Sequence, residues 1–242
     1  MREIGVSRIP LSLENVRRMK VFGTLRLWID PVARPGPEAM AVDEWLMETA
    51  DAPVLRVYRW LGNWGSIGYF GALDDAMRDL PGLEWLRRWT GGGTVDHRTD
   101  WTYTVIAPAD EPLARLRGAE SYRRLHAALA AALRAEGIDA RLSTGAQPSG
   151  SLLCFENPVS HDLIDAAGRK LAGAGQRRTR QGLLHQGSLA LMNMDPHEAR
   201  RAERLADCLA IKWDAKAYHP QPELMAHKIA QRYACHAWTQ RR

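Results

Sequence analysis

The sequence predicts a single α+β domain built on a mixed, mainly antiparallel sheet flanked by helices. The chain has 242 residues, of which 45% are hydrophobic, and this is enough for one core. Period-two strand patterns and helical apolar stripes both occur along it. They do not alternate as regular strand–helix–strand units, which disfavours a doubly wound parallel sheet. Residues 1–22 are interpreted as an N-terminal extension and residues 23–242 as the domain.

The first elements of the domain surround a proline-rich loop. Residues 25–29 alternate as a short strand, which Pro31 ends. The segment 31–37 contains too many prolines for regular structure and is expected to be a loop. Residues 38–49 carry apolar side chains near helical spacing, and residues 54–60 alternate with period two. We therefore expect a strand, a loop, a helix and a second strand in this order.

The central part of the chain is rich in glycine. Residues 61–71 contain four glycines and predict a long connection. Residues 83–90 form a strand candidate that leads directly into Gly91–Gly93, and residues 102–107 form another. Residues 120–137 place their apolar side chains on one helical stripe, and the glycine at the end is a natural C-cap.

The last third begins with a loop rich in Gly, Ser and Pro at residues 143–151. Three short strands are expected next, at residues 161–164, 170–174 and 188–192. Pro196 opens a helix with a buried apolar side. A last helix is expected over residues 222–235.

The net charge of +5 comes from an arginine-biased composition with 28 Arg and 5 Lys among the 33 basic residues. A charge of this size can steer an acidic partner toward the protein. The densest cluster is Arg177, Arg178 and Arg180, which falls short of the basic run with interleaved aromatics expected of a nucleic-acid site. We therefore expect no nucleic acid, and an acidic protein or a simple solvated surface instead.

The sequence also bears on the compartment. No apolar run approaches the roughly 20 residues of a membrane span, and residues 1–20 mix charges in a way that no secretory signal does. Cys154, Cys208 and Cys235 lie far apart without a CxxC pair, which suits a reducing cytoplasm and argues against a cysteine zinc site. We expect a cytoplasmic protein without membrane contact or bound metal.

Gly91–Gly93 is the first segment that can carry chemistry. Three glycines at a strand end allow positive φ and a close approach to a ligand, and their amides are able to cradle an anion. The spacing matches neither a P-loop nor a dinucleotide fingerprint. A tight turn is the structural alternative for the triplet, and a purely structural role is the alternative for the nearby His97.

Lys170 and Cys154 are the other two candidates. Lys170 stands in an apolar strand followed by small residues, where a lysine can polarise a carbonyl or bind phosphate. Its alternative is an edge-strand lysine that only keeps the sheet soluble. Cys154 lies at a loop-to-strand junction sixteen residues earlier, and a nearby lysine lowers the pKa of a thiol. Its alternative is a buried structural cysteine, as expected for Cys208 and Cys235 on helices.

In order along the chain, several segments resemble the lipoate–protein ligase and octanoyltransferase superfamily, which shares the catalytic fold of biotin protein ligase and class II synthetases. The resemblance covers roughly residues 25–209. Its motifs are EAMAVDE at 38–44, LRVYRW at 55–60, GSIGYF at 65–70, RRWTGGGTVDH at 87–97, GRKLAG at 168–173 and HQGS at 185–188. After Leu209 about 33 residues remain, too few for the accessory C-terminal domain of the ligases.

The resemblance implies a narrow acyl tunnel roofed by the glycine loop, with Lys170 at the acyl carbonyl. Leu153-Cys154-Phe155 is similar to the element that carries the nucleophile in the cysteine-dependent, LipM-type octanoyltransferases. It implies transfer of octanoyl from acyl carrier protein to a lysine of a lipoyl domain or glycine-cleavage H protein, without a cofactor. The expected catalytic residues are Cys154 and Lys170, and the expected substrate contacts are Arg88, Thr90, Gly91, Gly92, Gly93, His97, Gly173, Ala174, Gly175, Gln186, Gly187 and Ser188.

Three alternatives remain open at the level of sequence. An ATP- and Mg-dependent lipoate–protein ligase would hold an acyl-adenylate with Lys170 and leave Cys154 incidental. An octanoyl amidotransferase between carrier proteins, or a binding module without turnover, would keep the same fold. Two departures from the family pattern motivate the binding module: Ala174 replaces the usual serine, and Gln186 stands where a histidine is usual.

Overall fold

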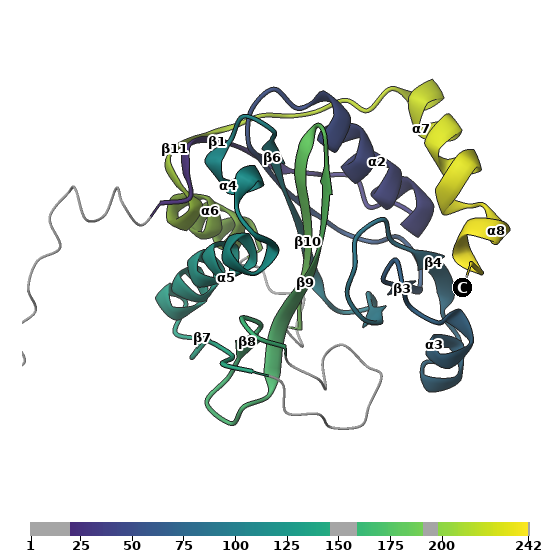
Figure 1. Cartoon of the computed structure of the whole chain (residues 1–242), viewed down its shortest axis with the longest axis horizontal. Coiled ribbons are helices and arrows are strands. Elements are labelled where there is room, and N and C mark those ends of the chain that lie inside the picture. The colour runs from purple at the N-terminus through teal and green to yellow at the C-terminus, as the bar shows by residue number, and fades with distance from the viewer. Residues whose placement is uncertain (1–19, 146–158, 191–197, 242) are drawn as a thin grey trace, which may run out of the picture.

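The computed structural model describes residues 20–145, 159–190 and 198–241. Its main sheet has eight strands and lies between helices (Figure 1). From one edge to the other the strands are β11 (Ala210–Ala215), β1 (Phe22–Ile29), β2 (Val54–Tyr58), β6 (Trp101–Pro108), β10 (Gly182–Leu189), β9 (Lys170–Thr179), β8 (Leu163–Ile164) and β7 (Arg141–Leu142). The first three are parallel to one another, and every pair from β2–β6 onward is antiparallel. The predicted fold class is confirmed.

Each face of this sheet covers its own hydrophobic core, because successive side chains of a strand point to opposite faces. In β2, Leu55 and Val57 belong to one core, whereas Val54 and Tyr58 belong to the other. The first core is covered by α5 (Gly118–Ala135) and α6 (Glu198–Leu209), and the second by α2 (Gly36–Thr49) (Figure 1). The central strands are therefore buried on both sides.

A small second sheet contains β4 (Glu84–Arg87), β3 (Trp64–Ile67) and β5 (Val95–Asp96). The strand β3 falls inside residues 61–71, so the prediction of a plain connection there was wrong. Gly65 lies in this strand, and the ring of Trp85 packs directly on it. A Cβ at Gly65 would lie 2.6 Å from that ring, so the packing requires glycine. From sequence alone Gly65 is therefore interpreted as a loop residue, although it is a strand residue that lacks a side chain for packing reasons.

The remaining helices are short: α3 (Leu73–Asp79), α4 (Pro112–Arg115), α7 (Pro222–Lys228), the π-helical turn η1 (Ile229–Tyr233) and α8 (His236–Thr239). The helix predicted over 222–235 is present from Pro222 to Tyr233, with α7 passing directly into the π-helical turn η1. The strand predicted at 188–192 is β10, which starts earlier and whose side chains are all buried, so that it lacks the polar alternation that reveals a half-buried strand. In the described part of the chain, no helix combines the length and hydropathy needed to cross a membrane.

Candidate functional site

A narrow cavity lies between the main sheet and the glycine loop that follows β4. Its volume is about 430 Å³, counted together with its open mouth. The cavity is lined by Met40, Tyr58, Trp60, Arg88, Gly92, Val95, His97, Thr102, Gly173, Ala174, Gly175, Gln186, Gly187 and Ser188. The strands β2, β6, β9 and β10 and the glycine loop thus all contribute to its wall.

The cavity runs across the strands of the main sheet. Gly173 on β9 is directly opposite Ser188 on β10, and Ser188 is opposite Thr102 on β6. Thr102 is in turn opposite Tyr58 on β2. All four residues line the cavity. A ligand in this slot therefore crosses from β9 toward β2.

The glycine loop packs directly on β9. A Cβ at Gly175 would lie 2.2 Å from the carbonyl oxygen of Gly91, so only glycine allows this approach. Gly92 has a φ of 99°, in the left-handed region that favours glycine. The Arg88 guanidinium donates to the carbonyls of Gly91 (3.2 Å) and Gly93 (2.9 Å) and so fixes the loop from within. The glycines roof the cavity and do not form a simple tight turn.

Lys170 begins β9 and lies in an ion pair inside the protein. Its Nζ is 2.6 Å from Oδ2 of Asp162, and both side chains are almost completely buried. Gly173 makes room for it, because a Cβ there would lie 2.7 Å from Nζ. Since β9 runs between β10 and β8, the alternative of an exposed edge-strand lysine is excluded. Lys170 therefore lies directly beside Gly173, which lines the β9 end of the cavity.

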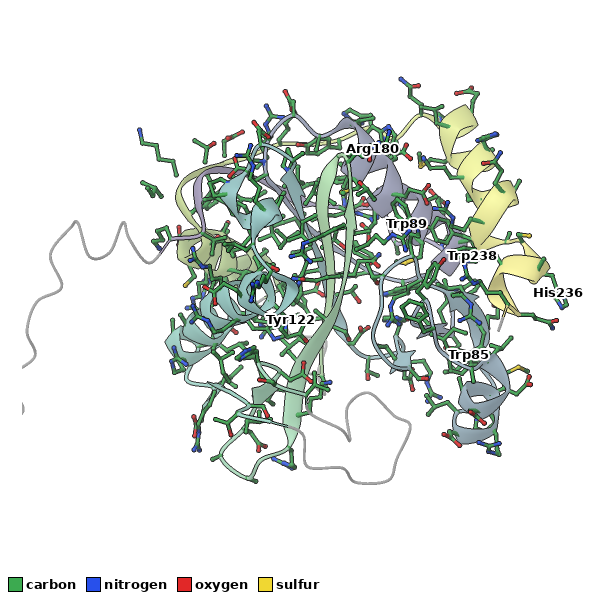
Figure 2. All side chains as sticks on the ribbon, in the orientation of Figure 1. Trp85, Trp89, Tyr122, Arg180, His236 and Trp238 are labelled. Atoms are coloured by element: carbon green, nitrogen blue, oxygen red, sulfur yellow. The ribbon has the colours of Figure 1, made fainter. Side chains whose placement is uncertain are left out.

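Asp162 is also held by α5 and by its own loop. The hydroxyl of Tyr122 donates to Asp162 Oδ1 and accepts the N–H of Ala174 at 2.9 Å, and the N–H of Val159 donates to Asp162 Oδ2 at 2.8 Å. Burial and the neighbouring Asp162 raise the pKa of Tyr122 well above its ordinary value, so Tyr122 remains a donor. Figure 2 shows Tyr122 on α5, beside β9. This contact ties the Lys170–Asp162 pair to the strand that lines the cavity.

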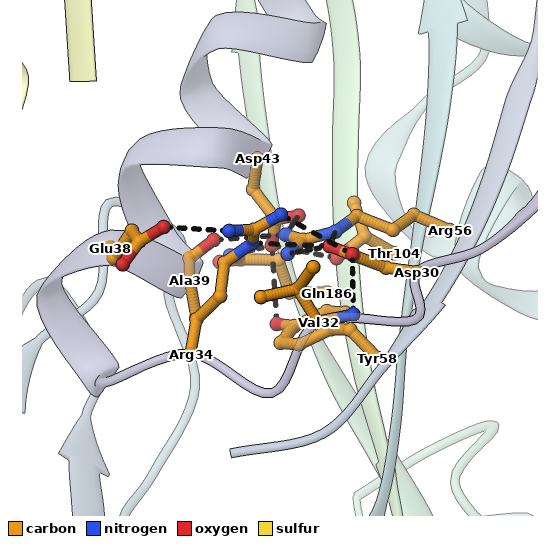
Figure 3. A network of polar contacts seen from close by, with 10 residues as sticks. All are labelled: Asp30, Val32, Arg34, Glu38, Ala39, Asp43, Arg56, Tyr58, Thr104 and Gln186. Carbon is orange, nitrogen blue, oxygen red and sulfur yellow. Dashed lines mark hydrogen bonds and ion pairs between the residues drawn. The ribbon is translucent and has the colours of Figure 1, made fainter. Parts of the chain in front are cut away.

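On the other side of the cavity, Gln186 enters a buried polar network (Figure 3). Its amide donates to Asp43 Oδ2 (2.7 Å), and its carbonyl accepts from Thr90 Oγ1 (2.7 Å). Asp43 in turn receives Arg56 Nη1 (2.7 Å) and the hydroxyl of Thr104 (2.7 Å). The residue at the position where relatives are expected to carry histidine therefore links the glycine loop to α2.

His185 has a different environment because neighbouring strand residues face opposite ways. It packs against Tyr103, Tyr122 and His126 on the α5 side of the sheet. Burial, the neighbouring His126 and Arg178 lower the pKa of His185 well below its ordinary value, so it is neutral. His185 therefore does not take the place of the histidine that the family pattern leads us to expect at position 186.

His97 stands at the β2 end of the cavity, between Ser66 and Asp100. Its Nε2 is 2.6 Å from Ser66 Oγ and its Nδ1 is 2.8 Å from Asp100 Oδ2. Asp100 also accepts from the hydroxyls of Thr102 and Ser188, both of which line the cavity. His97 is thus oriented by protein groups on both ring nitrogens.

The structure brings most of the predicted substrate contacts together. The cavity wall includes Arg88, Gly92, His97, Gly173, Ala174, Gly175, Gln186, Gly187 and Ser188. Of the others, Thr90 contacts Gln186, Gly93 contacts Arg88, and Gly91 lines a neighbouring pocket that shares Gly92, Ala174 and Gly175 with the cavity. Their roles in substrate binding stay predictions.

The three cysteines have separate outcomes. Cys154 lies outside the described residues, so its role as nucleophile stays a prediction. Cys208 is half-buried on α6, and burial raises the pKa of its thiol, which disfavours the reactive thiolate. Cys235 is half-buried at the N-cap of α8 rather than within a helix.

Sequence reasoning missed several residues of the site. Asp162 and Tyr122 hold Lys170, whereas Met40, Trp60 and Thr102 line the cavity. None of them has a local signal in the sequence, because contacts between distant segments place them here. Asp162 stands in the mixed segment His161–Asp165, which contains a second carboxylate at Asp165.

Comparison with known proteins agrees with this geometry. A family model described as the lipoyl protein ligase A/B catalytic domain matches residues 35–226. An octanoyltransferase LipM of Carboxydothermus hydrogenoformans is 34% identical over 178 residues, which are 69% of this chain and 66% of that protein. The LipM of Symbiobacterium thermophilum is 35% identical over 195 residues, or 74% and 69% of the two chains. The chain thus matches about two thirds of the length of these octanoyltransferases.

Solved structures show the same fold. A lipoate-protein ligase A bound with ATP has a TM-score of 0.68 at 21% identity, covering 90% of this chain and 98% of that chain. A bipartite lipoate protein ligase from Thermoplasma acidophilum, described with its E2 lipoyl domain, has a TM-score of 0.64 at 18% identity, covering 91% and 96%. The similarity to the octanoyltransferases supports an acyltransferase. The chain belongs to the lipoyl protein ligase A/B catalytic-domain family.

Proposed function

We propose that this protein is an octanoyltransferase of lipoate biosynthesis. It moves octanoyl from acyl carrier protein to a lysine of a lipoyl domain or of glycine-cleavage H protein. The observation that carries the proposal is the buried Lys170–Asp162 pair at the β9 end of a narrow cavity, in a chain similar to named octanoyltransferases. A fixed positive charge beside a thin apolar slot suits the carbonyl end of a fatty acyl chain.

The chemistry proceeds in two steps. The thiolate of Cys154 attacks the thioester carbonyl of octanoyl-acyl carrier protein, and the C–S bond to Cys154 forms as the C–S bond to the carrier breaks. The carrier leaves as a thiolate and takes up the proton that the Cys154 thiol gave up on ionisation. The amine of the acceptor lysine then attacks the octanoyl-Cys154 thioester and forms an amide, losing a proton as Cys154 is released. Lys170 contacts the carbonyl oxygen, and donors of the glycine loop support the developing oxyanion.

Energetics make ATP unnecessary in this scheme. The first step exchanges one thioester for another, so it is nearly balanced, and the second converts a thioester into the more stable amide. The ATP-bound ligase of similar fold keeps the ATP-dependent ligase as the competing function, since both would use the same cavity and Lys170. The route by which the acyl group arrives is what distinguishes them.

The positive charge of the chain suits acidic carrier domains as donor and acceptor. Arg178 lies at the neighbouring pocket that adjoins the cavity, since a Cβ at Gly118 of that pocket would be 3.7 Å from its Nη1. Arg177 precedes it on the same strand and lies over the rings of Tyr69 and Trp89. An acidic carrier domain is drawn toward a rim of this charge, and steering of this kind acts mainly on the association rate.

Intact-protein mass spectrometry tests the proposal. The wild-type protein mixed with octanoyl-acyl carrier protein, without ATP, should gain an octanoyl adduct that hydroxylamine removes and that maps to Cys154. The Cys154→Ala variant should gain none, whereas the matched Cys208→Ala variant should react like the wild type. Absence of the adduct, together with acyl-adenylate formation from octanoate and ATP, would replace the transferase by the ligase.

A further inference from the structure

A second hollow shares part of its wall with the cavity. Its volume is about 500 Å³, counted together with its open mouth. Its wall comes from the glycine loop, the first residues of α5, the loop before β8, and β9: Gly91, Gly92, Gly118, Ala119, Tyr122, Val159, Ser160, Ala174, Gly175 and Gln176. Most of these residues are glycine or alanine, so backbone atoms are exposed along much of the wall. We call this hollow the β9-edge groove.

The groove follows an edge of β9 that no described strand covers. β8 pairs with β9 only as far as Ala172, and the described part of the chain places no strand beside β9 after that residue. The Ala174 N–H points to this edge, where it donates to the Tyr122 hydroxyl at 2.9 Å. The Gln176 carbonyl faces the same way, since it accepts the N–H of Gly91 at 3.5 Å. Because a strand residue directs both its backbone groups to one edge, the Ala174 carbonyl and the Gln176 N–H are also directed into the groove.

A positive charge without a carboxylate partner among the described residues stands at one end of the groove. The Arg178 guanidinium donates to neutral groups only, at Ser121 Oγ (2.5 Å) and Gln176 Oε1 (3.2 Å). Its Nη1 lies close to Gly118, where a Cβ would be 3.7 Å away. The other end, at Ala174, meets the cavity, with which the groove shares three lining residues. The groove thus leads from the cavity to a cation.

The spacing along β9 decides which kind of ligand fits. Ala174 and Arg178 are separated by about 13 Å of strand. The phosphopantetheine arm of an acyl carrier carries amides and a phosphate, and it spans about 16 Å from sulfur to phosphorus when extended. Its thioester can therefore lie at the cavity while its phosphate contacts Arg178. The side chain of an acceptor lysine, about 6 Å long, would fill less than half of this length.

We infer that the β9-edge groove binds the phosphopantetheine arm of the octanoyl donor. The arm lies along the free edge of β9 as an added strand would, and its amides pair with the Ala174 carbonyl and the Gln176 N–H. Its phosphate contacts Arg178, and its thioester lies where the groove meets the cavity, near Lys170. The inference rests on the proposed function, since it takes an acyl carrier as the donor.

Carrier-free donors with arms of increasing length test this. Octanoyl thioesters of N-acetylcysteamine, pantetheine and phosphopantetheine add first an amide and then the phosphate. The kcat/KM for acyl-enzyme formation should rise at each step, and by about tenfold or more at the phosphate, as expected for a charge-assisted contact. Arg178→Gln should abolish the gain from the phosphate. Arg180→Gln, in the turn between β9 and β10 (Figure 2), is the matched control and should keep it.

A second variant narrows the groove without changing its charge. Ala119 lines the groove and is exposed on α5, so Ala119→Leu adds bulk there with a good helix former. It should lower kcat/KM for the phosphopantetheine donor by about tenfold or more and affect the short N-acetylcysteamine donor much less. Ala135→Leu, exposed at the other end of α5, is the matched control and should react like the wild type.

Calorimetric titration with free phosphopantetheine measures the groove without any transfer. The wild type should bind it, and Arg178→Gln and Ala119→Leu should each bind about tenfold more weakly. These losses in a protein that accepts octanoyl from no donor would remove the proposed transferase but retain the groove. Wild-type donor preference and wild-type phosphopantetheine binding in both variants would overturn the inference and leave the proposed function intact.

Two other outcomes would also overturn the inference by assigning the groove to a different ligand. If Ala119→Leu forms the acyl-enzyme normally and slows only transfer to the acceptor lysine, the groove belongs to the acceptor domain. If the wild type binds AMP but not phosphopantetheine, and Ala119→Leu loses the AMP, the groove holds a nucleotide, as the competing ligase would require.

Discussion

Two buried ion pairs lie on opposite sides of the cavity, and they differ in kind. Arg56 is enclosed by Asp30 (2.8 Å) and Asp43 (2.7 Å), and it lies over the rings of Trp28 and Tyr58. Its guanidinium also donates to the carbonyl of Ala39 on α2 at 2.9 Å (Figure 3). Planar, permanently charged and hydrogen-bonded on several sides, Arg56 fastens α2 to the sheet.

Lys170 and Asp162 form the second pair, which borders the cavity through Gly173. Lysine is a compact point charge on a flexible stem, so it suits contact with a single oxygen better than a rigid fork does. The comparison teaches that burial of an ion pair does not define its role. An arginine that is surrounded by protein partners holds the fold, whereas the lysine beside the cavity stands where the proposed function needs a contact to the acyl carbonyl.

The largest expected effect is a loss of stability when Arg56 is substituted. Arg56→Met leaves Asp43 buried without its countercharge and Asp30 with Arg34 alone, and breaking such a buried pair costs about 3–5 kcal/mol of the free energy of unfolding. Denaturant titration measures this loss. Arg59→Met, an exposed arginine three residues away, should change stability by less than about 0.5 kcal/mol. Equal losses in the two variants would mean that Arg56 does not fasten the fold.

Substitution of Lys170 should instead lower the rate of octanoyl transfer. Lys170→Met removes the charge at the carbonyl end, and by analogy with the loss of an oxyanion donor the octanoyl-transfer rate should fall about 10²–10³-fold. Single-turnover transfer by folded protein measures this. Lys212→Met, on the exposed part of β11, is the matched lysine control and should transfer normally. Full transfer by Lys170→Met would break the comparison between the two pairs.

Acid should lower the stability of the protein through the buried histidines His126 and His185, which lie on the same side of the cavity as Lys170. Burial lowers the pKa of His126, beside Tyr122, to about 4 from 6.5, and His185 is shifted in the same direction. In the unfolded chain these histidines take up protons below about pH 6.5, while in the folded protein His126 does so only near pH 4. Stability therefore falls as pH drops from about 6.5 to about 4, by at most about 3 kcal/mol for His126.

Urea titrations across this pH range measure the slope. The His126→Gln variant keeps an amide donor for the carbonyl of His161, which His126 Nδ1 contacts at 2.7 Å, and it should show a shallower slope. A wild-type stability independent of pH between 6.5 and 4 would contradict a neutral, buried His126.

The smallest effect is expected at Gln186, which joins the glycine loop to the arginine side. Gln186→Leu removes the hydrogen bonds to Asp43 and Thr90 and should cost about 1–2 kcal/mol of the free energy of unfolding. Gln186→Glu places a second carboxylate against Asp43 and should cost more. Thermal unfolding of the two variants decides the order, and a less destabilised Gln186→Glu would contradict the hydrogen-bond directions given for Asp43.

The sequence predicted those parts of the fold in which one side chain pattern dominates. The stripe of α5 and the alternation of β2 each follow a single period, and both elements were located within a few residues. The strand β3 and the edge strand β11 were missed, since glycine packing hides the first and mostly exposed side chains weaken the pattern of the second.

The candidate site divides in the same way. The glycine loop and Lys170 stand in motifs and were found, although their chemical roles came from family resemblance. Asp162 and Trp60 were not found, because their positions depend on contacts between distant segments. Trp60 meets Thr102 only after β2 pairs with β6, and sequence patterns contain no register. The alternation of side chains along β10 likewise does not predict the hydrogen bond from Gln186 to Asp43.

The parallel pairing of β1 with β11 has a consequence for biosynthesis. Phe22 of β1 pairs with Ala210 of β11, so one edge of the sheet joins an early segment to a late one. A ribosome that has released only the first half of the chain exposes β1 without this neighbour, and loops of such length close slowly. Vectorial folding of this domain therefore finishes late, and a nascent chain that carries an open strand edge depends on protection until β11 emerges.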